Sequence, residues 1–352
     1  MTTCHEAKQL YETLLTQKKA FNHLRPDIKD SGTRSQMKIK QSEIETAIKN
    51  LREIVIPKEI KEVVEQYERQ VKMLERVGIL EKGKRAITGI DGVEYPLPGS
   101  IKQVLMAEKE KILKKKEQGF GRLLLVPFGM PLETLVEIYK KVILEHAKAG
   151  TIDAEVDVND CLDISDEWID EKQPKGKRGA DVTGKCVYYA KKLEQDNHGG
   201  LTKQEILEKQ KKQKSATAGW RILMMETEKD IPREKAGKIV GKRKQIEAGK
   251  SATEYLKMLM KPEYAQEQGM SLEDWLMLAI LFLEEKQQVI DNWQAGGSFC
   301  RLPGSFNFSS GWLASARWFR GDQRAGLHDG DPEFERDYGG VRFAVEVNKL
   351  AF

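Results

Sequence analysis

The sequence predicts an α+β protein in which a helical N-terminal region is followed by a domain that mixes strands with helices. Three observations support this fold class. Residues 4–82 place apolar side chains at intervals of three and four, which is the period of amphipathic helices. Two short apolar runs, 122–128 and 219–226, follow glycines and are typical of buried strands. Residues 298–347 lack lysine and are rich in Gly, Ser, Arg, Asp and aromatic residues.

The N-terminal helices are expected to be interrupted at Pro57, because proline cannot donate a helical hydrogen bond. The helix after it has one apolar stripe, made of Ile60, Val63, Val64, Tyr67, Val71 and Leu74. Such a stripe fits either a helical hairpin packed within the monomer or a coiled-coil stalk. Because heptads are not sustained, we favour the hairpin, and we keep a homo-oligomer formed through these helices as the second partner hypothesis.

Turn signals follow from Gly83 onward. The Asp-Gly pair in Ile90-Asp91-Gly92-Val93 is typical of a tight turn and predicts a small β-hairpin at 87–96. Ser100 is expected to cap a helix that ends in a run of three lysines, which complement the negative end of the helix dipole. These elements complete a helical N-terminal region, which we place at 1–118.

The second domain is placed at 119–352. It begins with the strand at 122–128 and a helix that reaches His146, and an irregular, polar insertion with short strands is expected at about 150–215. After the strand at 219–226, Ser251 and Ser271 each begin a capping box and therefore predict helix starts. The helix after Ser271 is apolar on nearly every face, which predicts the most buried helix of the domain.

Composition excludes several classes of protein. The 59 basic and 55 acidic residues nearly cancel, so the charge of +4 favours neither nucleic acid nor membrane as a partner. The cysteines have no paired spacing, which argues against a disulfide framework or a zinc site; they are Cys4, Cys161, Cys186 and Cys300. Neither a secretory signal nor a membrane-length apolar run is present, so we expect synthesis in the cytoplasm and no membrane insertion.

No metal and no cofactor are expected. The oxygen-bearing side chains of Asp157, Asn159 and Asp160 come close to a calcium loop, but the glycine turn and the closing glutamate of such a loop are missing. The basic segment 231–238 lacks the Gly-Lys-Ser/Thr of a phosphate loop and is better explained as a surface loop.

The C-terminal stretch 298–347 has the composition of a recognition surface. Trp, Tyr and Arg lie beside small residues, and rigid aromatics give contact area at low entropic cost. The alternative is a β-rich core with polar turns, which composition alone does not separate from a recognition surface.

Four segments and their order along the chain carry a resemblance to a known family. They are Gly89 to Pro96, Gly119 to Leu125, Asp331 to Phe334, and the closing Gly340-Val341-Arg342-Phe343. The order of elements resembles the C-type lectin fold in its formylglycine-generating-enzyme-like branch. Over residues 60–347 the chain more closely resembles the variable proteins of diversity-generating retroelements.

The resemblance implies ligand binding without catalysis. In that family, error-prone reverse transcription at adenines rewrites codons near the 3′ end of the gene, and the lectin scaffold stays fixed. Carried onto this chain, the variable region is about 298–347. The positions implied to be variable and ligand-binding are Trp312, Ala314, Arg317, Phe319, Gly321, Asp322, Gly326, His328, Arg336, Tyr338 and Phe343, with Ala344 as a further candidate. The ligand is expected to be a protein of unidentified sequence.

Residues between these positions are expected to form the scaffold: Ser310, Gly311, Trp318, Arg320, Leu327, Pro332, Gly340, Arg342 and Val345. An enzyme of the formylglycine-generating type, or another enzyme using the C-terminal domain, is the alternative function. It is disfavoured because Cys300 has no partner cysteine nearby in sequence, which argues against the cysteine pair that such enzymes use. Calcium-dependent sugar binding is disfavoured because the Glu-Pro-Asn and Trp-Asn-Asp patterns are absent.

Overall fold

The computed structural model describes residues 4–24, 31–55, 58–81, 83–99, 101–152, 156–165, 168, 185–293 and 296–347. The chain divides into two compact units, Met1–Glu62 and Val63–Phe352. Helices and strands are both abundant, so the α+β class is confirmed. The predicted boundary at 118–119 falls within the second unit, and the region 1–118 therefore contributes to both units.

Two helices make up most of the described part of the first unit. They are α1 (Cys4–Leu24) and α2 (Ser31–Val55), which pack against each other as a helical hairpin does. Lys18 of α1 and Glu45 of α2 form an ion pair of 3.0 Å. Pro57 lies outside the described residues, and α2 ends just before it. None of the helices that the structure describes combines the length and the apolarity of a membrane span.

The remaining helices begin with α3, which crosses the boundary between the units. The helices are α3 (Lys58–Val77), α4 (Ile101–Ala107), α5 (Lys109–Glu117), α6 (Leu132–Lys148), α7 (Lys203–Lys212), α8 (Ala252–Leu259), the short 3-10 helix η2 (Pro262–Tyr264) and α9 (Leu272–Lys286). The predicted stripe of α3 is buried along its whole length. The helix predicted after Ser100 is divided into α4 and α5 near Glu108, and Ser100 itself lies outside the described residues.

The predicted hairpin at 87–96 is confirmed as β1 (Ala86–Thr88) paired antiparallel with β2 (Glu94–Pro96). Tyr95 of β2 is buried, and its hydroxyl donates to Asp91 in the turn at 2.7 Å. The hydrogen bond and burial raise the pKa of Tyr95, burial being the larger cause. This hydrogen bond therefore links the turn at Asp91 to strand β2.

One sheet of the second unit has four strands in the order β3-β6-β15-β9, all antiparallel. These are β3 (Arg122–Val126), β6 (Arg221–Met225), β15 (Phe343–Glu346) and β9 (Glu267–Gly269). Both apolar runs predicted as buried strands, β3 and β6, are confirmed, and they pair with each other. The beginning and the end of region 119–347 therefore lie in the same sheet.

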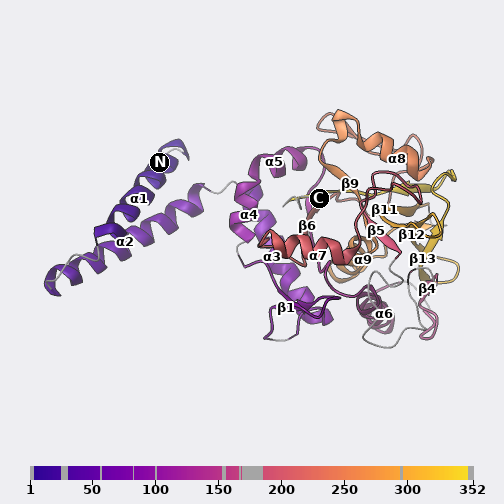
Figure 1. Ribbon diagram of the computed structural model, residues 1–352, viewed down its shortest axis with the longest axis horizontal. Helices are drawn as coiled ribbons and strands as arrows, with labels where there is room; N and C mark the ends of the chain where they lie inside the picture. Colours follow the sequence, from indigo (N-terminus) through magenta and orange to yellow (C-terminus); the bar gives the residue numbers. More distant parts are fainter. Residues whose placement is uncertain are drawn as a thin grey trace. The chain divides into compact units, whose positions relative to one another are not determined.

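The other large sheet contains the C-terminal stretch. Its main order is β14-β11-β12-β13-β4, with β10 beside β12 and β5 beside β11. Figure 1 labels β4, β5, β11, β12 and β13 of this sheet. The strands are β4 (Leu162–Ile164), β5 (Cys186–Tyr188), β10 (Asn292–Trp293), β11 (Phe299–Asn307), β12 (Trp312–Phe319), β13 (Arg324–Gly330) and β14 (Gly339–Val341). A small hairpin, β7 (Ile239–Val240) with β8 (Arg243–Lys244), lies outside it.

The predicted insertion contributes β4 and β5 to this sheet, so the expected short strands are confirmed. It also contains α7, which was not predicted. A capping box formed by Thr202 and Glu205 begins this helix. Much of 153–184 lies outside the described residues.

Helix α9 is the buried helix that the sequence predicts. Every residue from Leu272 to Leu283 is buried, and the capping box of Ser271 with Asp274 begins the helix. Helix α6 packs against α9, where the rings of Tyr139 and Trp275 meet edge to face with centroids 5.9 Å apart. Burial of so much apolar surface makes this pair of helices a large part of the core.

Candidate functional site

The central strands of the larger sheet align their side chains in rows. Strands β11, β12 and β13 are antiparallel neighbours, and side chains alternate between the two faces of a strand. Arg301, Ser315 and His328 occupy one row across the three strands. In the neighbouring row Arg317 lies opposite Gly326. These residues therefore share one face of the sheet.

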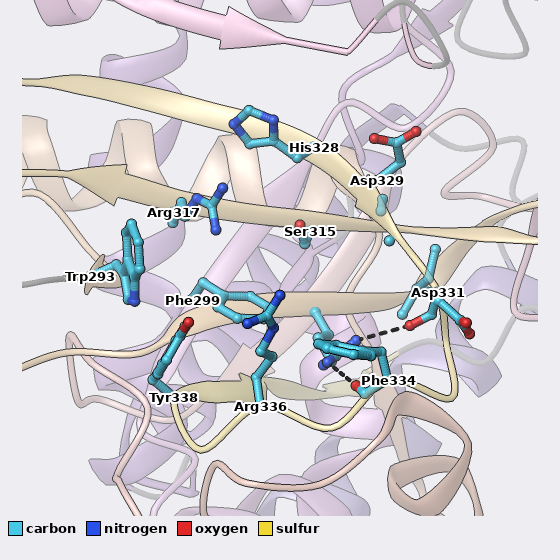
Figure 2. Close-up of a pocket in the computed structure, with 14 residues that line it drawn as sticks. Trp293, Phe299, Ser315, Arg317, His328, Asp329, Asp331, Phe334, Arg336 and Tyr338 are labelled. Carbon is cyan, nitrogen blue, oxygen red and sulfur yellow. Dashed lines mark hydrogen bonds between the residues drawn. The ribbon is translucent and has the colours of Figure 1, made fainter. Parts of the chain in front are cut away.

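A pocket of about 450 Å³ lies on this face. Strand β10, strands β11 to β13 and the segment that connects β13 to β14 all contribute to it. Its lining residues are Trp293, Phe299, Arg301, Leu313, Ala314, Ser315, Arg317, His328, Asp329, Gly330, Asp331, Phe334, Arg336 and Tyr338 (Figure 2). A volume of this size matches the range of small-ligand pockets, which is about 300 to 1,000 Å³.

Aromatic rings surround Arg317. Its guanidinium carbon lies 4.1 Å from the ring centroid of Phe319, 5.0 Å from that of Trp293 and 5.7 Å from that of Phe299. Tyr338 closes the same group, with its ring 5.5 Å from Trp293 and 5.9 Å from Phe299. We call Trp293, Phe299, Phe319 and Tyr338 the aromatic group. Cation–π attraction to its rings stabilises Arg317 in this position.

Several nitrogen atoms at the pocket lack a hydrogen-bond partner among the described residues. These are Nε of Arg301, Nε of Arg317 and Nε2 of His328, all of them buried. Arg301 is only 4% exposed, and its terminal nitrogens donate to the backbone carbonyls of Asp331 and Phe334. A buried donor without a partner is costly, so these atoms provide unused hydrogen-bonding capacity.

Burial lowers the pKa of Arg317 below its ordinary value, and the charge of Arg336 adds to the effect. Burial also lowers the pKa of His328, with Arg317 as the next cause, while Asp163 opposes both. An arginine remains charged in proteins despite such a shift, whereas His328 is favoured in its neutral form near pH 7. The permanent positive charge of the pocket therefore comes from its arginines.

The two carboxylates that line the pocket, Asp329 and Asp331, lie at one end of it. Figure 2 shows Asp329 and Asp331 on the side away from Trp293 and Tyr338. The register agrees with this, because Asp329 pairs with Ala314 near the start of β12, and Trp293 pairs with Phe319 at its end. Asp329 accepts a hydrogen bond of 2.9 Å from Ser165. One end of the pocket is acidic and the other is aromatic and basic.

The structure brings five of the predicted variable positions into this pocket: Ala314, Arg317, His328, Arg336 and Tyr338. Phe319 adjoins them through its contacts with Arg317 and His328. Gly326 lies under the same rings, since a Cβ there would come within 2.5 Å of His328 and of Phe319. Seven of the twelve positions implied by the resemblance therefore lie in the pocket or directly beside it.

The other predicted positions lie elsewhere. Trp312 is exposed at the start of β12, and Gly321 and Asp322 are exposed in the turn between β12 and β13. Phe343 is only 3% exposed and packs in a hydrophobic cluster with Val341, Tyr255 and others. Placing Phe343 on a ligand-binding surface does not fit this burial, because its side chain cannot reach a ligand without leaving the core. Ala344 is likewise buried.

Sequence reasoning missed several residues of the pocket, chiefly Trp293, Phe299, Arg301, Ser315 and Phe334. For Ser315, the sequence contains a pattern that predicts its place on this face. Alternation along β12 places Ser315, Arg317 and Phe319 on one face, whereas Ala314 and Ala316 are fully buried. Trp293 gave no such signal, because it reaches the pocket only through the pairing of β10 with the end of β12.

An ion pair holds β10 in place. Asp291 is fully buried and accepts a hydrogen bond of 2.8 Å from Arg342 and one of 2.8 Å from the indole of Trp275. Its backbone carbonyl accepts from the N–H of Trp318 at 3.0 Å. Because Trp293 follows two residues later, this network sets the position of one wall of the pocket.

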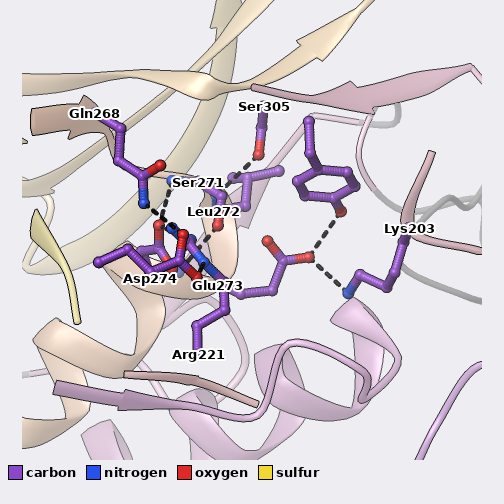
Figure 3. A network of polar contacts seen from close by, with 10 residues as sticks. Lys203, Arg221, Gln268, Ser271, Leu272, Glu273, Asp274 and Ser305 are labelled. Carbon is purple, nitrogen blue, oxygen red and sulfur yellow. Dashed lines mark hydrogen bonds and ion pairs between the residues drawn. The ribbon is translucent and has the colours of Figure 1, made fainter. Parts of the chain in front are cut away.

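A second buried polar network ties β11 to α9 (Figure 3). Ser305 of β11 accepts a hydrogen bond of 3.0 Å from the backbone N–H of Leu272 in the first turn of α9. In the same turn, both carboxylate oxygens of Asp274 lie 2.6 Å from one terminal nitrogen of Arg221 on β6. The start of α9 is therefore fixed to both large sheets.

Lys203 of α7 and Glu273 of α9 extend the network. Their charged groups lie 2.7 Å apart and are fully buried, and Tyr188 of β5 donates to Glu273 at 2.7 Å. Burial raises the pKa of Glu273, but the charge and hydrogen bond of Lys203, together with the hydrogen bond from Tyr188, hold the pKa below its ordinary value. The carboxylate therefore stays ionised, and the predicted insertion is joined to the core through charge.

No cysteine is among the residues that line the pocket. Cys161, Cys186 and Cys300 are buried, and burial raises the pKa of Cys300 well above its ordinary value. Within the described ranges, no group of three His, Cys, Asp or Glu side chains could hold a metal ion. In the acidic segment, Asp160 pairs with Arg324 at 2.6 Å.

Comparison of the chain with protein-family models, with curated proteins and with solved structures finds no match.

Proposed function

We propose that this chain is a ligand-binding protein of the diversity-generating retroelement type, with a C-type lectin-like domain whose variable face surrounds the pocket. The observation that carries the proposal is the convergence of five positions, implied to be variable by the resemblance alone, on one pocket. They come from β12, from β13 and from the segment before β14.

The arrangement of region 119–347 supports the lectin-like part of the proposal. Its first and last strands, β3 and β15, are both neighbours of β6 in one sheet. The C-terminal stretch forms the antiparallel succession β11, β12 and β13, and a long segment between α6 and β6 contributes edge strands. These features agree with the order of elements on which the resemblance rests.

Burial supports the division into scaffold and variable positions. Six of the nine residues expected to be scaffold are buried, whereas Ser310 and Gly311 are half-buried and Arg320 is exposed. The buried ones are Trp318, Leu327, Pro332, Gly340, Arg342 and Val345. The positions around the pocket are half-buried or exposed, apart from Ala314 and Gly326. A side chain on the face can be exchanged at small cost in stability, whereas exchange in a packed core costs several kcal/mol. A rigid scaffold also spares the ligand the entropy of ordering a loop.

We propose no catalytic role for this face. A formylglycine-type reaction needs a reactive cysteine, and the Cys300 thiol is fully buried with a raised pKa. His328 and Asp329 both line the pocket, but the Asp329 carboxylate accepts from Ser165 and Nε2 of His328 has no hydrogen-bond partner among the described residues, so they do not form an acid–base pair.

The retroelement origin is tested on the DNA downstream of the gene. A near-repeat of the codons for 298–347, differing at adenines and accompanied by a reverse transcriptase gene, is expected. If neither is found, the diversification proposal fails.

The tolerance of the pocket face to amino-acid substitution is tested with two libraries of variants. One randomises positions 317, 319, 322, 328, 336 and 338, and the other randomises the scaffold positions Trp318, Leu327, Arg342 and Val345. Most members of the first library are expected to stay resistant to proteolysis, and most of the second to lose resistance, because core exchange unfolds marginally stable proteins. Equal loss in both libraries would show that the face belongs to the core.

Binding is tested by replacing Trp312, Phe319 and Tyr338 together with alanine. The variant should lose binding to its ligand while its melting temperature stays nearly unchanged, because aromatic anchors supply much of an interface's affinity. A large drop in melting temperature would instead mark these side chains as structural.

A further inference from the structure

The charges around the pocket are unbalanced at its aromatic end. Arg301, Arg317 and Arg336 line the pocket, and none of them lies within ion-pair distance of a carboxylate in the part of the chain that the structure describes. The nearest acidic influence on Arg317 in its own row is Asp163, two strands away across Gly326. Elsewhere in the second unit, buried arginines are matched, as Arg221 is by Asp274 and Arg342 is by Asp291. The pocket arginines depart from this pattern.

Each of these arginines is positioned by something other than an anion. Aromatic rings flank Arg317. Backbone carbonyls hold the terminal nitrogens of Arg301, and its Nε remains unpartnered. The ring of Phe334 lies 4.3 Å from the guanidinium of Arg336. Three positive groups are therefore oriented in advance, while part of their hydrogen-bonding capacity is unused. Such preorganisation reduces the entropy that binding costs.

We propose that the pocket binds an oxyanion, a carboxylate or a phosphate monoester, through the guanidinium groups of Arg317 and Arg336, with the group that carries the anion packed on the aromatic group. Guanidinium matches both oxyanions through two parallel hydrogen bonds. The inference rests on the proposed ligand-binding role of this face and assigns the chemistry of the ligand that this particular set of side chains selects.

Two features favour an oxyanion attached to an apolar group over a free ion. Phe299 and Tyr338 place an apolar wall directly beside the guanidinium groups. Asp329 and Asp331 make the opposite end of the pocket acidic, so an anion is favoured only at the aromatic end. The ligand is thereby oriented, with its negative group toward Arg317 and away from the two aspartates.

The test uses three small probes with the full chain: benzoate, phenyl phosphate and benzamide. Benzamide keeps the ring and the planar shape of benzoate but has no charge. Binding is followed by NMR through the Arg Nε–H and Trp indole N–H signals, which detect dissociation constants on the order of 1 mM, as expected for such small ligands. Benzoate or phenyl phosphate should shift the signals of Arg317 and Trp293, and benzamide should bind at least about tenfold more weakly because it lacks the charge-assisted bonds.

Two arginine variants and one matched control locate the binding site. Arg317→Gln and Arg336→Gln should each weaken binding of the charged probe about tenfold or more. Arg336 is exposed, so its variant keeps the test valid if Arg317→Gln fails to fold. Arg320→Gln removes an exposed arginine that follows β12 but does not line the pocket, and it should leave binding unchanged.

The outcomes distinguish a carboxylate ligand from a phosphate ligand, and they distinguish failure of this inference from failure of the proposed function. Tighter binding of benzoate than of phenyl phosphate assigns a carboxylate, and the reverse order assigns a phosphate. Three results would each overturn the inference. These are equal affinity for benzamide and the anions, no NMR shift with either anion up to roughly 20 mM, and unchanged binding by the Arg336→Gln variant. These results leave the retroelement proposal standing, while absence of the downstream repeat overturns that proposal and leaves anion binding intact.

Discussion

Replacing Asp291 with asparagine tests whether the buried ion pair with Arg342 supports the domain and the wall of the pocket. Asparagine has the same shape and tolerates the left-handed backbone at this position, where φ is 49°. The substitution therefore removes the charge with little other change. Arg342 is left buried with two backbone carbonyls, those of Glu228 and Lys229, as its acceptors.

The expected cost is about 3 kcal/mol, the lower end of the range for breaking a buried ion pair, because asparagine still accepts from Trp275. Urea unfolding followed by tryptophan fluorescence measures it. All six tryptophans lie between residues 168 and 318, so the signal reports on the second unit alone. Asp322→Asn, which changes an exposed aspartate, should stay within about 0.5 kcal/mol of the original protein.

A loss below about 1 kcal/mol for Asp291→Asn would refute the reasoning, since surface changes produce losses of that size. Adding Arg342→Met to Asp291→Asn should recover part of the stability, because the uncompensated charge is removed together with its partner. A double mutant whose losses simply add would show that the two side chains do not interact.

Two further predictions concern the pocket. The pKa of His328, measured by NMR of its ring, should lie below 6.5. Arg317→Gln should raise this pKa, because the guanidinium opposes protonation of the imidazole. An unchanged pKa of His328 in that variant would contradict the assigned cause. Since the folded-state pKa is depressed, the contribution of His328 to stability is present above about pH 6.5 and is lost as the pH falls toward the folded-state pKa. Gly326→Ala should displace the rings of His328 and Phe319, which a Cβ would approach to 2.5 Å, at a cost of about 1 kcal/mol. Gly330→Ala on the same strand meets nothing within 4 Å and is the control, and identical NMR spectra around the pocket for both variants would refute the predicted clash.

Local signals predicted local structure well. The capping boxes at Ser251 and Ser271 were recognised, and both helices begin there. A third box, at Thr202 with Glu205, was passed over because the lysine-rich segment around it was interpreted as irregular, and α7 was missed for that reason. The interruption between α4 and α5 has no proline or glycine to predict it.

The pocket was predicted only in part because its walls meet through long-range pairing. Arg317 and His328 were singled out from one contiguous stretch, whereas Trp293 joins them through the parallel pairing of β10 with β12. Phe343 was placed on the surface because it lies in the same stretch, yet the chain changes sheets at Arg342 and carries Phe343 into the core. Membership of a sheet is decided by partners far away in sequence, which a single strand pattern does not encode.

The side chain at position 317 strongly affects which ligand charge the proposed binding face would favour, because it lies among the rings of the aromatic group. Position 317 is implied to be variable, while Trp293 and Phe299, two of the rings that flank it, are outside the implied set. A copy with a small neutral residue at 317 would leave those rings open, and their electron-rich faces attract cations. Exchange of this one side chain would thus weaken the attraction of anions to the aromatic end of the pocket, while Arg301 and Arg336 would still line the pocket and the strands would stay the same.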